Sequence, residues 1–261
     1  MDKLKLIALY DRDQRVDVEY PSFRREAASH VVRSMDTSEP GEGAVIYSRL
    51  DESNADDIIR EQVSYFESAG QDFEWKVYDY DQPSDLKERL ASHGFTIGKA
   101  EAIMLLDLSE APDILWQPVQ HHLQRILDPE RISDVLSVEG GVWDEDLTNL
   151  GQFLRGAVSE YPEQMSVYAA YIDGQPVSAA WIFFPNHSQF ASLWGGATLQ
   201  GYRKRGLYTA LLSARAQEAR ARQVKYLTVD ATPMSRPILE KFGFVKIADS
   251  YPCKWKLKSR K

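Results

Sequence analysis

The chain has 261 residues, which is enough for one large domain or two of ordinary size. Hydrophobic residues make up 43% and charged residues 27%, a composition that is typical of a globular protein and excludes a disordered one. The formal net charge of −8 argues against a general nucleic-acid binder, and a single cysteine, Cys253, excludes an internal disulfide.

The first 40 residues contain one apolar stretch, 6–10, that is too short for the hydrophobic part of a signal sequence. No run in the chain approaches the length of a membrane-spanning helix. We therefore expect a cytoplasmic protein with no membrane partner, in keeping with its single cysteine. Apolar residues at helical spacing predict a short helix over 24–35, and a Pro-Gly turn follows at 38–41.

The rest of the first half alternates between strand and helix patterns. In order, we expect a strand at 44–50, a helix at 55–69, a strand at 73–80, a short helix at 83–93, and a closing hairpin of 95–97 with 102–108. A Pro-punctuated connection at 109–129 contains a short helix and the pair His121 and His122. Adjacent histidines point to different faces and have no further ligands at metal-binding spacing, so no metal site is expected.

The second half shows the same alternation more completely. We expect helices at 132–138 and 145–158, a hairpin of 166–172 with 176–184, a strand at 189–199, a helix at 207–222, a strand at 224–230, a short helix ending at 243, and strands at 244–248 and 255–257. Asp173 and Gly174 form the two-residue turn of the hairpin. Ser235 is the expected N-cap of the short helix.

The segments 73–95 and 225–244 share an order of elements. Each runs strand, acidic end, Pro-containing turn, short helix, Gly-Phe and a further strand. This order favours a degenerate duplication over a chance likeness of two β-α-β pieces. Four carboxylates crowd the start of helix 55–69 and would repel a pyrophosphate, so we expect only the second half to bind a phosphorylated ligand.

The stretch 199–217 is the most informative part of the chain. Arg203, Lys204 and Arg205 are followed by Gly206 and then by a strong helix pattern. A strand, a cationic loop and a helix N-terminus together favour an anion, because the first turn offers unpaired N–H groups and a positive dipole end. A solvated turn is the alternative that these residues alone leave open.

The sequence RKRGLY followed by TALL resembles the pyrophosphate-binding loop of the GCN5-related N-acetyltransferase (GNAT) superfamily. Arg203 and Gly206 match the motif, whereas Tyr208 stands where the family has a small residue. The segment PILEKFGF, 237–244, supports the resemblance at the usual distance downstream. The resemblance covers 132–257, and more weakly 44–108 as a partial second copy.

This resemblance implies an α/β fold of two GNAT-like units, each a mixed, mainly antiparallel sheet flanked by helices, the N-terminal one partial and degenerate. It implies a degenerate domain at 1–110, a connection at 111–130 and an acetyl-CoA-binding GNAT domain at 131–261. It also implies acetyl-CoA as the co-substrate, with no metal. The residues implied to bind it are Ala197, Thr198, Leu199, Arg203, Lys204, Arg205, Gly206, Leu207, Tyr208, Thr209 and Ser235.

The catalytic residues stay unassigned. Leu239 stands where the family often has a tyrosine acid, Thr232 stands where it often has an asparagine, and 192–198 lacks the frequent carboxylate base. The remaining candidates each have an ordinary structural interpretation as well; they are Glu139, Tyr208, Tyr251 and Cys253.

The resemblance predicts an enzyme that transfers an acetyl group directly from acetyl-CoA to the amine of a small molecule or peptide. Two alternatives remain: a catalytically silent acyl-CoA-binding module, and a transferase that uses aminoacyl-tRNA. The acidic net charge speaks against the RNA-sized ligand. The acceptor and the oligomeric state are left open by the sequence.

Overall fold

The computed structural model describes residues 2–37 and 41–257, so the turn expected at 38–41 lies mostly outside the described residues. The described chain is a mixed α/β protein in which 12 strands form mainly antiparallel sheet, as the fold class predicted. It divides into two compact units. Of the described residues, unit 1 holds 2–104, 230–238 and 246–257, and unit 2 holds 105–229 and 239–245.

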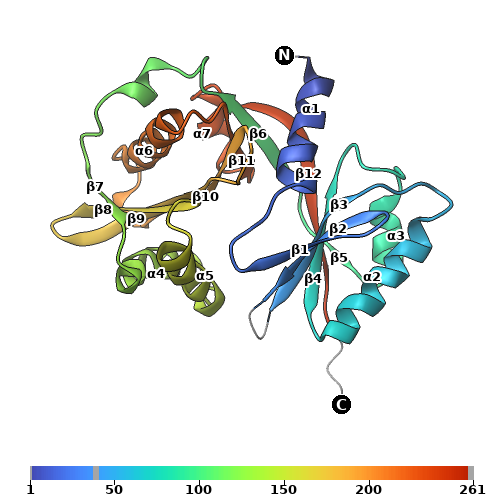
Figure 1. The fold of residues 1–261 in the computed structure, drawn as a ribbon. Coiled ribbons are helices and arrows are strands. Elements are labelled where there is room, and N and C mark those ends of the chain that lie inside the picture. The colour runs from blue at the N-terminus through green and yellow to red at the C-terminus, as the bar shows by residue number, and fades with distance from the viewer. Residues whose placement is uncertain (1, 38–40, 258–261) are drawn as a thin grey trace. The chain divides into compact units, whose positions relative to one another are not determined.

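Unit 1 is built on a sheet with the strand order β1-β2-β3-β4-β12, and β5 also pairs with β12. All of these pairings are antiparallel except that between β3 and β4. Its elements include the π-helical turn η1 (Arg12–Val16). The others, labelled in Figure 1, are α1 (Lys3–Asp11), β1 (Phe23–Ala27), β2 (Val31–Asp36), β3 (Glu42–Ser48), α2 (Ala55–Ala69), β4 (Asp72–Tyr78), α3 (Leu86–Ser92) and β5 (Thr96–Ile97).

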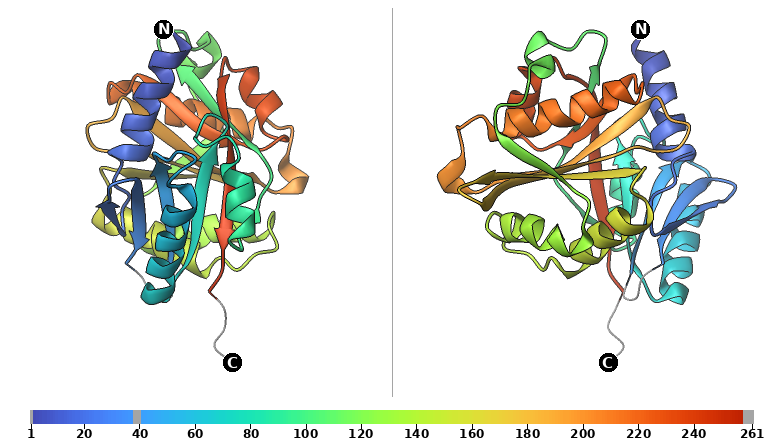
Figure 2. Two further views of the ribbon diagram at one scale, coloured as in Figure 1. Left: turned by 90° about the vertical axis from the view of Figure 1, so that its right-hand side faces the viewer. Right: turned by 60° about the vertical axis from the view of Figure 1, so that its left-hand side comes forward.

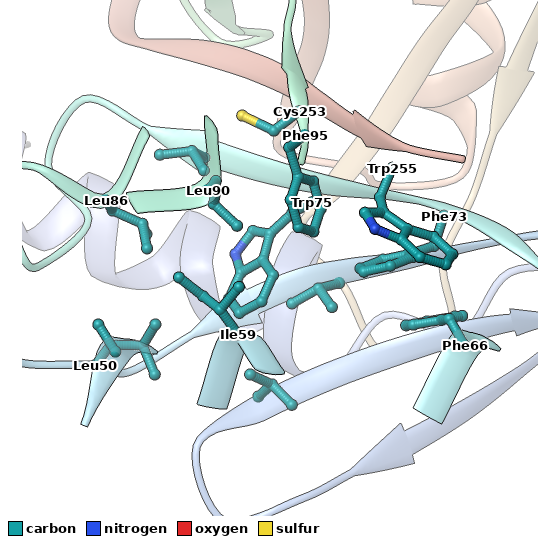
Figure 3. Packing of buried hydrophobic residues seen from close by; sticks show 14 of the residues in the cluster. Leu50, Ile59, Phe66, Phe73, Trp75, Leu86, Leu90, Phe95, Cys253 and Trp255 are labelled. Atoms are coloured by element: carbon teal, nitrogen blue, oxygen red, sulfur yellow. The ribbon is translucent and has the colours of Figure 1, made fainter. Parts of the chain in front are cut away.

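Helix α2 shows how the sequence produces unit 1. Its helical spacing places Ile59 and Phe66 in the core, and Gly70, with φ of 69°, ends it in the left-handed conformation that glycine adopts without strain. Phe66 stacks on Phe73 of β4 with ring centroids 4.0 Å apart. Figure 3 shows these rings beside Trp75 and the other apolar side chains of the same cluster.

Two predictions for the first half are wrong. Residues 24–35 form the hairpin of β1 and β2, in which Ala27 pairs with Val32, rather than a helix. β2 also pairs with β3, so its β-branched residues are buried in a sheet, and tertiary pairing outweighs a helical spacing that only three apolar residues carried. The strand β5 pairs with β12 instead of closing a hairpin with the strand that follows it.

Unit 2 is built on a sheet with the order β11-β10-β9-β8-β7, in which only the β10–β11 pairing is parallel. Strand β7 was not predicted. The elements are η2 (Asp113–Trp116), β7 (His122–Ile126), η3 (Pro129–Arg131), α4 (Ile132–Gly140), α5 (Thr148–Glu160), β8 (Met165–Ile172), β9 (Gln175–Phe183), β10 (Phe190–Thr198), η4 (Gln200–Tyr202) and α6 (Leu207–Ala221).

Helices cover both faces of the sheet in unit 2. Helix α6 lies on one face of β8, β9 and β10, while α4 and α5 lie on the other (Figures 1 and 2). Strands β8 and β9 are therefore buried almost throughout. The predicted two-residue turn joins them, with φ of 51° at Asp173 and 77° at Gly174, as a type I′ hairpin requires.

Four elements contribute residues to both units: β6 (Glu101–Asp107), β11 (Tyr226–Ala231), α7 (Arg236–Glu240) and β12 (Val245–Trp255). The two short strands expected at 244–248 and 255–257 are one continuous strand, β12. Its residues 250–255 pair with β4, so the end of the chain completes the sheet of unit 1. The division of the chain into domains at 1–110 and 131–261, which assumes a duplicated ancestral domain, stays a prediction.

Candidate functional site

Strand β10 leaves its parallel neighbour after the first third of its length. Its register with β11 runs from Phe190 to Ser192, and β10 then continues to Thr198 beyond the end of that pairing. A bulge against β9 lies between Gly195 and Ala197 on its other side. The second half of β10 therefore has backbone groups free of β11, as a strand needs if it is to bind an extended amide-containing ligand.

Two consecutive glycines make this bulge possible. Gly195 has φ of 67° and Gly196 has φ of 105°, a region that other residues enter only with strain. A Cβ on Gly195 would also lie 2.4 Å from the ring of Trp181 on β9. Gly195 is thus required by its backbone conformation and by the close approach of the indole.

A buried arginine on α6 supports the bulge from beneath. The guanidinium of Arg215 donates to the carbonyl oxygen of Trp181 at 3.1 Å and to that of Trp194 at 3.4 Å, on the two strands that flank the bulge. Its Nε also donates to the carbonyl oxygen of Leu211. Burial lowers the pKa of Arg215 to about 10, because no carboxylate among the described residues offsets the loss of water.

The cationic loop after β10 is exposed, while the helix that follows it is anchored in the core. Arg203, Lys204, Arg205 and Gly206 are all exposed. Leu207, by contrast, is 1% exposed and packs with Val177 of β9. The loop is held in place by its apolar end and leaves its charges facing solvent.

The start of α6 offers unpaired donors. Gly206, with φ of 80°, precedes the helix, and no side chain among the described residues caps it. The first backbone bond of the helix is donated by Ala210, so the N–H groups of Leu207, Tyr208 and Thr209 have no acceptor within the helix. These donors and the positive end of the helix dipole suit a phosphate group.

The stretch 197–199 is bound to the loop and to β9. Arg203 Nε donates to the carbonyl oxygen of Thr198 at 3.1 Å, and Ser178 Oγ donates to that of Ala197 at 2.7 Å. Leu199 N donates to the carbonyl oxygen of Val177 at 3.0 Å. The end of β10 and the cationic loop therefore form one connected structure.

His121 is a member of this site that the sequence did not reveal. A Cβ on Gly206 would lie 3.2 Å from its Nε2, so the imidazole lies directly against the glycine at the start of α6. His122 lies instead beside Tyr171, with ring centroids 5.7 Å apart, and bonds to Gln124. No local pattern signals this arrangement, because 85 positions separate His121 from Gly206 in the chain.

The structure brings ten of the eleven predicted ligand-binding residues into one strand–loop–helix segment of unit 2, but Ser235 belongs to unit 1. It immediately precedes α7, where its Oγ lies 3.3 Å from the carbonyl oxygen of Thr232. Its part in ligand binding stays a prediction.

The side chains proposed for chemistry fall into different environments. Tyr208 is half-buried against Gly196, 3.6 Å from the position of a Cβ there, and burial raises its pKa. Tyr251 lies on β12 under the ammonium group of Lys87. Burial raises the pKa of the Cys253 thiol to about 12, which favours its structural interpretation because so little thiolate is present near neutral pH.

Glu139 near the end of α4 is buried, with 4% of its surface exposed. Its Oε1 has no hydrogen-bond partner among the described residues. Burial raises the pKa of this carboxyl to about 7, and a hydrogen bond from the Trp143 side chain lowers it by less. Two residues further on, a Cβ on Gly141 would lie 2.5 Å from Leu199 Cδ2, which places the end of α4 against the end of β10.

In the described part of the chain, no group of three or more His, Cys, Asp or Glu side chains is arranged to hold a metal ion. No helix there is both long and apolar enough to cross a membrane. The exposed cations, the unpaired N–H groups of α6 and the backbone of β10 beyond its pairing with β11 would suit a ligand with an extended polar arm and an anionic end.

Comparison with known families identifies the class of site. Residues 131–244 match the acetyltransferase (GNAT) family. This range includes β10, the cationic loop and α6. The chain therefore contains a domain of the GNAT superfamily, as the loop motif predicted. No curated protein matches the sequence.

Solved structures share the fold of the whole chain at low sequence identity. A GCN5-related N-acetyltransferase from Kribbella flavida has 14% identity and a TM-score of 0.67 over 97% of this chain and 93% of that one. A tandem GNAT protein from the clavulanic acid biosynthesis pathway has 13% identity and a TM-score of 0.63 over 94% and 87%. A GNAT-family acetyltransferase from Colwellia psychrerythraea has 10% identity and a TM-score of 0.57 over 97% and 96%. The fold is thus that of a tandem GNAT protein.

Proposed function

We propose that the chain is an acetyl-CoA-dependent N-acetyltransferase that transfers the acetyl group directly to the amine of a small molecule or peptide. The observation that carries the proposal is the uncapped start of α6, which follows exposed cations and a strand that has left its parallel neighbour. We further propose that it acts in the cytoplasm, without a metal and without nucleic acid as a partner.

The proposed donor site has two parts. The backbone of the second half of β10, including 197–199, pairs with the amide-containing pantetheine arm. The N–H groups at the start of α6 bind the pyrophosphate, and Arg203, Lys204 and Arg205 offset its charge. Gly206 lets the backbone approach the phosphates closely, since a side chain there would strain the backbone and lie against His121.

Bound acetyl-CoA supplies a thioester whose carbonyl carbon is open to attack by a neutral amine. The protein must then provide a proton acceptor for the ammonium group, hydrogen-bond donors for the developing oxyanion and a proton for the departing thiolate. In this proposal, β10 and α6 of unit 2 bind the donor and do not by themselves fill these three catalytic roles. Arg215 contributes by holding the carbonyl groups on both sides of the bulge.

Calorimetric titration with acetyl-CoA tests the proposal, and absence of binding at millimolar ligand would overturn it. The variant Gly206→Trp places an indole over the start of α6, and we expect it to weaken binding on the order of 100-fold, corresponding to about 2.7 kcal/mol. Gly174→Trp is the matched control, because Gly174 also has a positive φ, of 77°, but has open space around it. Thermal melts of both variants separate loss of binding from loss of fold.

A second candidate function is a catalytically silent acyl-CoA-binding module. Leu239, at the position of the family's frequent tyrosine acid, is completely buried, and its aliphatic side chain has no proton to supply. Acetyl-CoA binding without acetyl transfer to any member of a broad amine panel would favour this module over the enzyme. The aminoacyl-tRNA-dependent alternative predicts a gel shift with charged tRNA, which the acidic chain is not expected to give.

A further inference from the structure

Glu139 is a buried acid without a structural explanation. Buried carboxyl groups in proteins are normally paired with a cation or fully hydrogen-bonded, because desolvation makes an unpaired one unfavourable. The carboxyl of Glu139 has one oxygen without any partner among the described residues, and its neighbour is the side chain of Trp143. A polar group held in this way is a candidate for a functional role.

The place of Glu139 in unit 2 connects it with the proposed donor site. Helix α4 packs on β9 and β10. The end of this helix meets the end of β10, since Gly141 lies against Leu199. Glu139 thus precedes by two residues the glycine that contacts the end of β10, the strand that we propose holds the pantetheine arm.

The loop that leads from α4 to α5 carries a surface suited to a cation. Trp143 is 44% exposed, and Asp144 and Glu145 are exposed with no hydrogen bond or ion pair within the described residues. Asp146 is the exception, since it accepts hydrogen bonds from the N–H and hydroxyl groups of Thr148. The segment 139–146 contains four carboxylates and no lysine or arginine.

We propose that Glu139 accepts the proton of the incoming amine substrate, and that this substrate is a cationic aliphatic amine guided by Trp143, Asp144 and Glu145. This inference rests on the proposed acetyltransferase function. An exposed indole attracts an ammonium group through its ring face, and the two free carboxylates add a favourable field at the same loop.

The ammonium group of the acceptor gives one proton to Oε1 of Glu139, which turns the carboxylate into a carboxylic acid and leaves a neutral amine. The nitrogen lone pair forms the C–N bond to the thioester carbon. The C–S bond breaks, its electron pair stays on sulfur, and the second nitrogen proton ends on the departing thiol.

A group that titrates near neutral pH suits this role, because it is partly ionised at that pH and still basic enough to accept a proton. Burial raises the pKa of Glu139, the hydrogen bond from Trp143 lowers it by less, and no charged side chain contributes to the shift. The rate of the wild-type enzyme should therefore rise with pH through a pKa near 7.

The test compares Glu139→Gln with Glu130→Gln, which removes a carboxylate from an exposed position. With 1,4-diaminobutane as acceptor, we expect Glu139→Gln to lower kcat by about 100-fold or more and to lose the pH dependence near 7, at an unchanged affinity for acetyl-CoA. Glu130→Gln should match the wild type. Equal kcat and pH profiles for Glu139→Gln and the wild type would refute the role of Glu139.

A ligand-free measurement supplies a second readout. The pKa of Glu139 is raised above its ordinary value of 4.5, so its neutral form stabilises the fold and this contribution is lost as pH rises toward 7. The melting temperature of the wild type should fall relative to that of Glu139→Gln over this range. A constant difference from pH 4.5 to 8 would show that Glu139 does not titrate as inferred.

The substrate class is tested by the paired variant Asp144→Asn with Glu145→Gln. We expect its KM for 1,4-diaminobutane to rise about tenfold with kcat retained, while KM for a zwitterionic amine such as serine stays constant. Faster transfer to serine than to the diamine by the wild type would contradict the cationic class. If acetyl-CoA fails to bind the wild type at all, the proposed function itself fails, which calorimetry distinguishes from these outcomes.

Discussion

His121 shows how a single residue can belong to a site without any local sequence signal. Its Nε2 lies against Gly206, beside the unpaired N–H groups of α6 and the cations of the loop. An imidazole in this place can donate a hydrogen bond to the phosphate that we propose the helix start binds. The neighbouring His122 faces Tyr171 and Gln124 instead, which makes it an internal control.

We therefore predict that His121→Ala weakens acetyl-CoA binding roughly fivefold, the equivalent of one hydrogen bond worth about 1 kcal/mol. His122→Ala should bind as the wild type does. Calorimetry on the three proteins at one pH and ionic strength measures the effect. Equal affinities for all three would remove His121 from the phosphate site.

At the scale of the element, the second half of β10 depends on glycine and on a buried cation. Gly195 adopts a left-handed conformation directly under the ring of Trp181. Arg215 holds the carbonyl oxygens of Trp181 and Trp194, so the two strands keep a fixed separation at the bulge. Glycine adopts this backbone conformation without strain, and the packing around it keeps the bulge in one place.

The variant Gly195→Ala tests this arrangement. A methyl group would clash with Trp181 and force an alanine into positive φ, so we expect a loss of roughly 3 kcal/mol of unfolding free energy from strain and overpacking combined. Gly174→Ala, at φ of 77° in open space, should lose only about 1 kcal/mol. Urea unfolding of both variants measures the difference, and equal losses would mean that the indole gives way without cost.

At the scale of the whole molecule, the last strand of the chain packs in the hydrophobic core of unit 1, which the N-terminal residues form. Residues 250–255 of β12 pair with β4, and Cys253 and Trp255 are buried in the same cluster as Phe73. Trp255 lies 5.6 Å from Phe73 between ring centroids. A chain cut at the predicted domain boundary would leave β4 with an unpaired edge and the cluster open to water.

We accordingly predict that the fragment 1–110 does not fold cooperatively by itself. The same fragment with 246–257 attached through a flexible Gly-Ser linker should regain a cooperative transition, because the missing strand is restored. Circular dichroism during urea titration compares the two. A cooperative transition of similar steepness in fragment 1–110 alone would show that its sheet is complete without β12.

Several features of the fold and the site follow from the sequence. The helices 55–69 and 207–222, the hairpin turn at Asp173 and Gly174, and the cationic loop before Gly206 were all predicted within a few residues. Each depends on neighbours in the chain: a helical period, a glycine that ends or begins a helix, or a two-residue turn. The segment 24–35 was predicted wrongly because its apolar residues showed only a weak helical period, and pairing with a distant strand decided its structure.

Sequence alone thus identified the superfamily to which the loop is related and predicted that this loop binds an anion, because those signals are local in the chain. The tertiary structure decided what surrounds the loop. It set His121 against Gly206 and Gly141 against Leu199, separated β10 from β11 and buried the carboxyl of Glu139. It also paired residues 250–255 of β12 with β4 of unit 1. These are pairings between distant segments, selected by the burial of apolar surface across the fold, and no local period encodes them.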